Sequence, residues 1–149
     1  MNFAHVHLVI NHLPVVGTLF CFLLVLAASF MKNQDVLKLS LGFCIFIAVV
    51  TIPVFLTGDP AKDVIEKMPG ISDNLIESHE EAAVFSFILV EIMGVLSAVG
   101  IYTRVKKIML PKWYLTSFLF VIFLTMIFMT WTANQGGKIQ HKEIQVDFK

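Results

Sequence analysis

Three of the five histidines in this chain fall within one short segment, residues 5–14, whose sequence is HVHLVINHLP. The other two are His79 and His141. A neutral imidazole is a common metal ligand and an axial ligand of haem iron. These residue types therefore predict a metal or haem site, provided that the surrounding elements bring some of the histidines to one place.

The composition predicts an integral membrane protein. Of the 149 residues, 57% are hydrophobic and 15% are charged, and the mean hydropathy is +0.81, which is too apolar for a soluble domain of this size. A helix needs about 20 apolar residues to cross the hydrocarbon core, and four stretches are that long: Val6–Met31, Leu37–Thr57, Ala82–Tyr102 and Trp113–Thr132. We predict an all-α fold in which residues 1–149 form a single domain, an up-down bundle of four transmembrane helices.

The charges of the connections predict that both termini lie outside. The first stretch is longer than the roughly 7 to 15 apolar residues of a signal peptide and has no basic segment before it, so it is expected to be a retained span. The connections after the first and third helices are short and basic, as cytoplasmic loops tend to be. Their cations are Lys32, Lys38, Arg104, Lys106, Lys107 and Lys112. The remaining connection, residues 58–81, carries seven acidic residues against two lysines, so we expect an acidic outer face.

Turn signals predict further structure in the outer connection. Asp59-Pro60 is typical of a helix start, and a short amphipathic helix over residues 61–68 is expected to lie between the second and third spans. Pro69-Gly70 ends this helix. Ser72 or Asp73 then caps a helix that continues to Arg104, so the third span is expected to project about two turns beyond the membrane and to carry His79 on its projecting end.

With this orientation all five histidines lie on the outer side. A bis-histidine b-type haem takes one imidazole from each of two facing helices, and His12 and His79 are the expected pair. His7 and His12 differ by about 140° around a regular helix, so both face one point only if Pro14 bends the chain. His7 then either pairs with His141 at a second haem or supports the first haem as a hydrogen-bond donor.

The predicted cofactor is therefore haem b, in one or two copies. We interpret the double glycine at 136–137 as a turn that returns the C-terminal tail over the histidines, where Lys138 and Lys142 pair with the haem propionates. Two alternatives stay open for the histidines. They are ordinary interfacial polar residues, as is expected of His5, or they bind a metal such as copper or zinc.

Glu91 is expected near the middle of the third span with no Lys or Arg at a comparable depth, where an unpaired carboxylate is costly. It is a candidate proton-relay or quinone-headgroup site. Alternatively, it is a protonated acid that bonds to Thr51 or Thr125. Cys21 and Cys44 lack the C-x-x-C spacing and are expected to be small apolar fillers.

Small residues are frequent on the third span, which predicts that this helix packs closely against another. They are Ala82, Ala83, Gly94, Ser97, Ala98 and Gly100. The partner is either another helix of the bundle or a second subunit in a homo-oligomer.

The segment His7-Leu-Val-Ile-Asn-His12-Leu-Pro14 resembles the first helix of a family of small, largely uncharacterised bacterial four-helix membrane proteins. The likeness extends over the whole chain, through His79 at the opening of the third helix and the double glycine at 136–137 after the fourth. The resemblance implies that His7, His12 and His79 are the functional histidines and that the protein lies in the bacterial inner membrane. Some family members are joined to Rieske-type or c-type cytochrome modules, which implies haem binding and membrane electron transfer.

Two classes of function follow. The first is a membrane electron carrier with haem b, which passes electrons between a quinone or a respiratory complex and an outer carrier such as a c-type cytochrome. The acidic outer face suits a basic partner. The second is a non-catalytic accessory subunit of a larger membrane complex. The sequence has no H-E-x-x-H motif, P-loop, nucleophile elbow or basic stripe, so a stand-alone hydrolase and a nucleic-acid partner are not expected.

Overall fold

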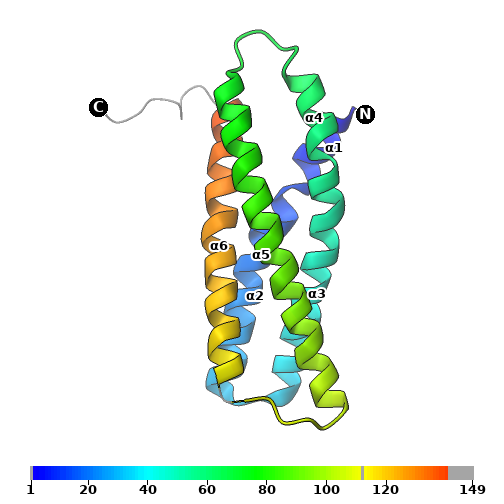
Figure 1. Ribbon diagram of the computed structural model, residues 1–149, viewed down its shortest axis with the longest axis vertical. Coiled ribbons are helices and arrows are strands. Elements are labelled where there is room, and N and C mark those ends of the chain that lie inside the picture. The colour runs from blue at the N-terminus through cyan, green and yellow to red at the C-terminus, as the bar shows by residue number, and fades with distance from the viewer. Residues whose placement is uncertain (1, 112, 141–149) are drawn as a thin grey trace, which may run out of the picture.

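Six helices make up the computed structural model, which describes residues 2–111 and 113–140. They are α1 (Phe3–Ile10), α2 (His12–Met31), α3 (Gln34–Leu56), α4 (Gly58–Ile65), α5 (Asp73–Val105) and α6 (Trp113–Gln140). The four long helices α2, α3, α5 and α6 form an up-down bundle, in which α2 and α5 each pack against both α3 and α6 (Figure 1). This confirms the prediction of an all-α four-helix bundle.

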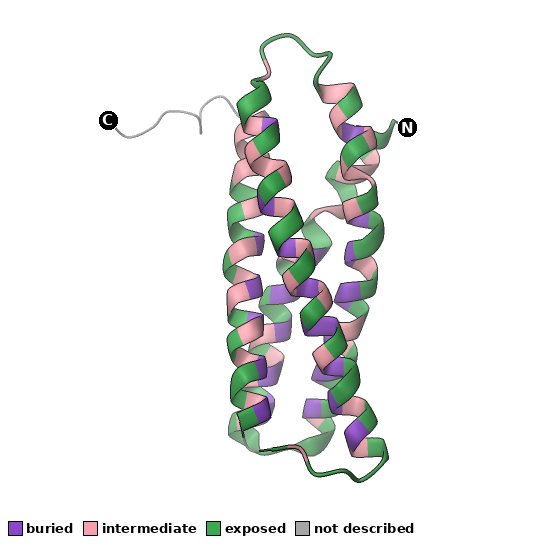
Figure 2. Cartoon of the chain, viewed as in Figure 1, coloured by how far each residue is buried: buried purple, intermediate pink, exposed green. Residues whose placement is uncertain are grey.

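Each of the four long elements is apolar enough to cross a membrane. The candidate spans are Phe3–Met31, Gln34–Ile65, Asp73–Val105 and Trp113–Ile139, with mean hydropathies of 2.0 to 2.6. Large apolar side chains remain exposed on the outer faces, for example Val9, Leu39, Phe46, Val95 and Phe120, while the buried residues face inward (Figure 2). An apolar exterior of this extent is suited to lipid contact, so the chain is a multi-pass membrane protein.

The first span is broken in two at Asn11, where a single helix was predicted over Val6–Met31. Pro14 lies in the first turn of α2, has no N–H to bond the Ile10 carbonyl, and its ring crowds that carbonyl. The chain therefore ends α1 at Ile10 and restarts as α2 at His12. Because of this break, α1 leaves the bundle axis and packs against α4.

The second span continues into the short helix predicted for the connection. Pro53 lies inside α3, and the helix ends three residues later at Leu56. Thr57 occupies the turn, its hydroxyl donating to the Val54 carbonyl at 2.8 Å. The short helix α4 follows at once, so it begins earlier than predicted and ends at Ile65 rather than residue 68. We call this end of the bundle, which holds α1, α4, the start of α5 and the end of α6, the α4 end (Figure 1).

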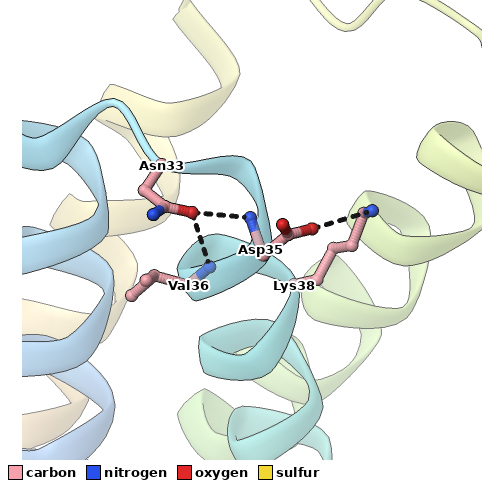
Figure 3. Close-up of polar contacts among 4 residues, drawn as sticks. All are labelled: Asn33, Asp35, Val36 and Lys38. Atoms are coloured by element: carbon pink, nitrogen blue, oxygen red, sulfur yellow. Dashed lines mark hydrogen bonds and ion pairs between the residues drawn. The ribbon is translucent and has the colours of Figure 1, made fainter.

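Local capping sets the start of α3 at the opposite end. Lys32 adopts a left-handed conformation, φ 50°, which closes α2. The Asn33 side-chain oxygen then accepts hydrogen bonds from the backbone N–H groups of Asp35 and Val36 at 2.9 and 3.1 Å (Figure 3). Asp35 lies in the positive first turn of α3 and pairs with Lys38 at 3.4 Å. This N-cap and the acidic first turn favour a helix that begins at Gln34.

The third span matches its prediction closely, because α5 runs unbroken from Asp73 to Val105 after Gly70 turns the chain at φ 83°.

The fourth span does not match its prediction. The turn predicted at the double glycine is absent, and α6 continues through Gly136 and Gly137 to Gln140. Glycine costs a helix only about 1 kcal/mol relative to alanine, so it does not by itself end a helix, and Gly136 packs against the His79 ring. Lys138 therefore lies in the last turn of α6, and His141 and Lys142 lie outside the described residues.

Two of the small residues of α5, Gly94 and Gly100, pack inside the bundle. A Cβ placed on Gly94 would lie 2.5 Å from the Ala48 Cβ of α3, and one on Gly100 would lie 2.6 Å from the Tyr114 hydroxyl of α6. That hydroxyl donates to the Leu96 carbonyl at 2.7 Å. Close packing of backbones by small residues is typical of helix contacts in membranes, so this face of α5 is occupied by its own chain.

We expect Gly94→Ala to loosen the α3–α5 contact, because its methyl group overlaps that of Ala48. The free energy of unfolding, measured by denaturation in mixed micelles, should fall by about 1 to 3 kcal/mol. Gly42→Ala on α3 is the matched control, since no atom lies within 4 Å of the added Cβ, and its stability should be unchanged or higher by about 0.5 to 1 kcal/mol. Equal stabilities of the two variants would contradict the packing described.

Candidate functional site

A cavity of about 720 Å³ lies at the α4 end of the bundle. This volume is within the range of about 300 to 1,000 Å³ found for small-molecule and cofactor sites. All six helices contribute to its walls, which are mainly apolar. The apolar side chains include Val15, Val54, Phe55, Phe87 and Met129. Three of the five histidines, His7, His12 and His79, lie on the same walls.

The half-buried His79 ring is held from the neighbouring helix. Its Nδ1 lies 3.0 Å from the Thr132 carbonyl oxygen on α6. A carbonyl oxygen can only accept a hydrogen bond, so Nδ1 carries the hydrogen. In a neutral imidazole the other nitrogen, Nε2, then has a free lone pair. The contact therefore selects the tautomer in which Nε2 is able to bind a metal.

Gly136 makes room for this ring. A Cβ at Gly136 would lie 3.0 Å from Cε1 and 3.2 Å from Nδ1 of His79, whereas a Cβ at Gly137 would meet nothing within 4 Å. The absence of a side chain at Gly136 therefore lets the imidazole lie directly against α6, within reach of the Thr132 carbonyl one turn earlier.

The half-buried His7 ring is held in a corresponding way. Its Nδ1 lies 3.0 Å from the Thr57 hydroxyl oxygen. That hydroxyl already donates its only hydrogen to the Val54 carbonyl at 2.8 Å, so it accepts the bond from His7. Nδ1 of His7 is thus the protonated nitrogen, and Nε2 keeps its lone pair. His7 and His79 are close enough to interact electrostatically.

The remaining histidines are placed differently. His12, the first residue of α2, lines the cavity, but its side chain is exposed. His5 is exposed and does not line it, and its backbone N–H donates to the Asn2 side chain at 3.0 Å. After the break at Asn11, α1 packs against α4, and His7 bonds to Thr57 at the turn between α3 and α4. The structure therefore brings His7 and His79 together in protected positions and leaves His12 at the rim.

A group of charged side chains lies at the mouth of the cavity. Lys62 on α4 pairs with Glu80 on α5 at 2.8 Å and with Glu66 on its own helix at 3.7 Å. Lys62, Glu80 and Asp59 all line the cavity. Because Glu80 follows His79 directly, the pair with Lys62 ties α4 to the histidine-bearing turn of α5. Asn11 also lines the cavity, and its buried side-chain oxygen has no hydrogen-bond partner among the described residues.

Several of these residues were not expected from the sequence. Thr57, Thr132, Gly136 and Lys62 become functional candidates only through contacts between helices. The signal in the sequence is the His-rich first segment, and that signal does not specify which residues of the other helices bond to the histidines. The imidazole partners depend on the rotation of each helix, which the chain sets through packing along its full length.

The other sequence candidates lie away from the cavity. Cys21 and Cys44 are free and fully buried in the core, as expected of apolar fillers. Glu91 does not bond to either threonine proposed for it: the Thr51 hydroxyl donates to the Ile47 carbonyl and the Thr125 hydroxyl to the Val121 carbonyl. That part of the prediction was wrong because serine and threonine hydroxyls inside a helix commonly bond to the carbonyl four residues earlier.

The described ranges, 2–111 and 113–140, contain no group of three or more His, Cys, Asp or Glu side chains placed to hold a metal ion. A zinc site with three or four protein ligands is therefore absent from this part of the chain. A haem iron needs only two protein ligands, because the macrocycle supplies the other four. The pair of histidines on the cavity wall satisfies that smaller requirement.

Comparisons with protein-family models, curated protein sequences and solved structures give no match to this chain. No family is therefore identified. The feature of the sequence resemblance that the structure supports is the small four-helix membrane bundle.

We expect Gly136→Val to displace the His79 ring and to break its bond to the Thr132 carbonyl, because the new side chain occupies the space of Cε1 and Nδ1. The imidazole nitrogen chemical shifts of His79, measured by NMR, should change from the Nδ1–H tautomer to a mixture of tautomers. Gly137→Val is the control, since it adds the same residue to the same helix in open space. A His79 signal that is unchanged in both variants would show that the packing is not as described.

Proposed function

We propose that this chain is a membrane electron-transfer protein that binds haem b at the α4 end, with His7 and His79 as the axial ligands. One observation carries the proposal: both Nδ1 hydrogens are engaged by protein acceptors, which leaves two Nε2 lone pairs on one mainly apolar cavity. This pairing replaces His12 by His7 relative to the pair favoured from the sequence, because His12 is exposed.

The residues around the cavity fit a haem. The volume of the cavity is in the range of cofactor sites, and its apolar walls suit the face of a macrocycle. Gly58, Gly136 and Gly137 also line it, and glycines allow a flat ring to approach the backbone closely. When bound, haem supplies a one-electron couple. The protein's part is to hold two neutral imidazoles in position and to exclude water from the site.

The hydrogen bonds to the imidazoles are expected to set their strength as ligands. An acceptor on Nδ1–H fixes the ring orientation and raises the basicity of Nε2. The backbone carbonyl of Thr132 holds His79, and the hydroxyl of Thr57 holds His7. Because a carbonyl and a hydroxyl oxygen differ in acceptor strength, the two ligands are not equivalent.

Cations near the mouth would receive the haem propionates. Lys62 lines the cavity and takes part of the role proposed for lysines of the C-terminal tail. Lys138 lies in the last turn of α6 and stays a candidate for the same role. Lys142 and the proposed second-haem ligand His141 lie outside the described residues, so one haem is the number that the described part of the chain supports.

The charges at the α4 end indicate which redox partners would bind there. Acidic residues gather at the α4 end, among them Asp59, Glu66, Glu77, Glu80 and Glu81. Such a surface would attract a basic soluble carrier, such as a c-type cytochrome, and increase its rate of encounter. A quinone in the lipid or a respiratory complex would complete the electron path.

We expect purified, chemically reduced protein, expressed with haem supplied, to show the sharp visible bands of a low-spin bis-histidine haem. His7→Ala and His79→Ala should each abolish or convert this spectrum, since each removes one axial ligand. His5→Ala is the control and should leave the spectrum unchanged. His12→Ala separates the two possible pairings, because it should leave the ligation intact if His7 is the partner of His79.

Two results would contradict this function. If the wild-type protein takes up no haem, the chain is better described as an accessory subunit of a membrane complex. If it takes up copper or zinc in proportion to His7 and His79, as measured by metal analysis, the same imidazoles serve a different metal. Loss of the spectrum in His12→Ala but not in His7→Ala would restore the pairing of His12 with His79.

We further expect Thr57→Val to weaken haem binding by about 10- to 100-fold, which is the usual effect of removing a hydrogen-bond partner from a metal-bound histidine. Thr57→Ser keeps the hydroxyl and should bind haem as the wild type does. The dissociation constant and the midpoint potential report this effect, while the visible spectrum should stay that of a bis-histidine haem. Equal affinities of the valine and serine variants would rule out a role for this hydrogen bond.

A further inference from the structure

Glu91 is the one Asp, Glu, Lys or Arg side chain deep within the four spans of the described residues. The segments 8–31, 39–58, 82–103 and 113–137 contain no other Asp, Glu, Lys or Arg. One carboxyl oxygen of Glu91 is buried and has no hydrogen-bond partner among the described residues. A carboxylate at this depth is costly in lipid, and such residues normally pair or serve a function. The partner that Glu91 requires does not come from the described part of its own chain.

The position of Glu91 shows where that partner must come from. It lines a groove together with Phe87, Ile88, Ile92, Val95 and Leu96, all of which belong to α5. Because no other helix closes this groove, it lies on the outward face of α5, where Ile88, Ile92 and Val95 are exposed. Gly94 and Gly100 face inward instead, where they contact α3 and α6. The inward face of α5 therefore packs within the bundle, and its outward face is left for contacts outside it.

The outward face carries a regular seam. Its members are spaced alternately four and three residues apart, and they are Val84, Ile88, Glu91, Val95, Ala98 and Tyr102. All are exposed except Glu91, which is partly exposed. This 4-3 spacing is the heptad pattern by which two helices pack along their length. A single polar residue in such a seam fixes the register of the pair.

We infer that two copies of this chain associate through this seam of α5, with the two Glu91 carboxyl groups hydrogen-bonded to each other. Copies inserted in the same direction are related by an axis along the membrane normal, so each residue meets its own counterpart at the same depth. A neutral carboxyl group has one donor and one acceptor, and its complement is therefore a second neutral carboxyl group. The seam is thus self-complementary in shape, depth and polarity.

This association does not depend on haem binding. Glu91 is twelve residues along α5 from His79, which corresponds to about 18 Å along the helix axis. Glu91 lines the groove of α5 and not the histidine cavity, although Phe87 lines both and the seam residue Val84 lines the cavity. The dimer and the proposed function can therefore fail separately.

Disulfide trapping in native membranes tests which surface forms the contact. Val95→Cys, on the seam, should form a dimer when the full chain is oxidised. Val49→Cys on α3 is the matched control: its exposed fraction is 58%, against 63% for Val95, and the contact of Ala48 with Gly94 places both at the same depth. The native cysteines are fully buried, so they should not crosslink the copies. Crosslinking of the two variants to the same extent would overturn the assignment of the seam.

Substitution of Glu91 tests the carboxyl pair. Glu91→Gln keeps a donor and an acceptor and should dimerise as the wild type does. Glu91→Leu keeps the size but removes both, and its dimer dissociation constant in lipid bilayers should rise roughly 5- to 30-fold. The constant is measured by energy transfer between labelled copies at decreasing protein-to-lipid ratios, with helical content checked by circular dichroism.

Three results would overturn the inference. They are a wild-type protein that is monomeric at every protein-to-lipid ratio, a Glu91→Leu variant that dimerises as tightly as the wild type, and a monomer that binds a quinone analogue in a Glu91-dependent manner. The last would assign the groove to a lipid-soluble ligand instead of a second copy.

Discussion

The structure depends on one constraint, that a polar group in hydrocarbon must find its hydrogen-bond partner within the protein. Continuous helices meet it for the backbone. Hydroxyl groups in the spans meet it by bonding to the carbonyl three or four residues earlier, as Thr18, Ser40, Thr51 and Ser97 do. These hydroxyl groups are therefore not candidates for a functional role. Polar groups that are not satisfied in this way are the ones that need a functional explanation.

The constraint also explains why the cavity lies at the α4 end. Helices are interrupted there, at Asn11 and at Thr57, although the backbone N–H groups of both residues keep their bonds to the carbonyls four residues earlier. At the second interruption the Thr57 hydroxyl accepts from His7 while it donates to its own helix. The opposite half of the bundle has continuous helices, and its core is built from apolar residues such as Val25, Leu41 and Phe118. Proline positions in the first and second spans thus determine which end is able to hold a ligand.

The sequence was a good guide to elements and a poor guide to contacts. Apolar length predicted four spans, and Pro69-Gly70 with Ser72 predicted the start of α5 at Asp73, because these signals act within a few residues. The prediction of a turn at the double glycine was wrong, since Gly136 packs against His79 within the helix. The choice between His7 and His12 as the partner of His79 is likewise not decided by the sequence. It depends on a bend at Asn11 and on how α1 packs against α4, which no local pattern specifies.

His79 and Glu91 show two ways of meeting the same constraint on one helix. His79 lies where α6 presents a backbone carbonyl, so one ring nitrogen is satisfied inside the chain and the other is left for a ligand. Glu91 lies three turns further on, on the outward face of α5, and one of its carboxyl oxygens is buried without a hydrogen-bond partner among the described residues. Moving a carboxyl group to the inward face would require a cavity in a closely packed core, where the buried hydroxyl groups of Thr51 and Ser97 already donate to their own helices. The internal packing of the chain therefore stays intact, and the hydrogen-bond partner of the Glu91 carboxyl group has to come from outside the bundle.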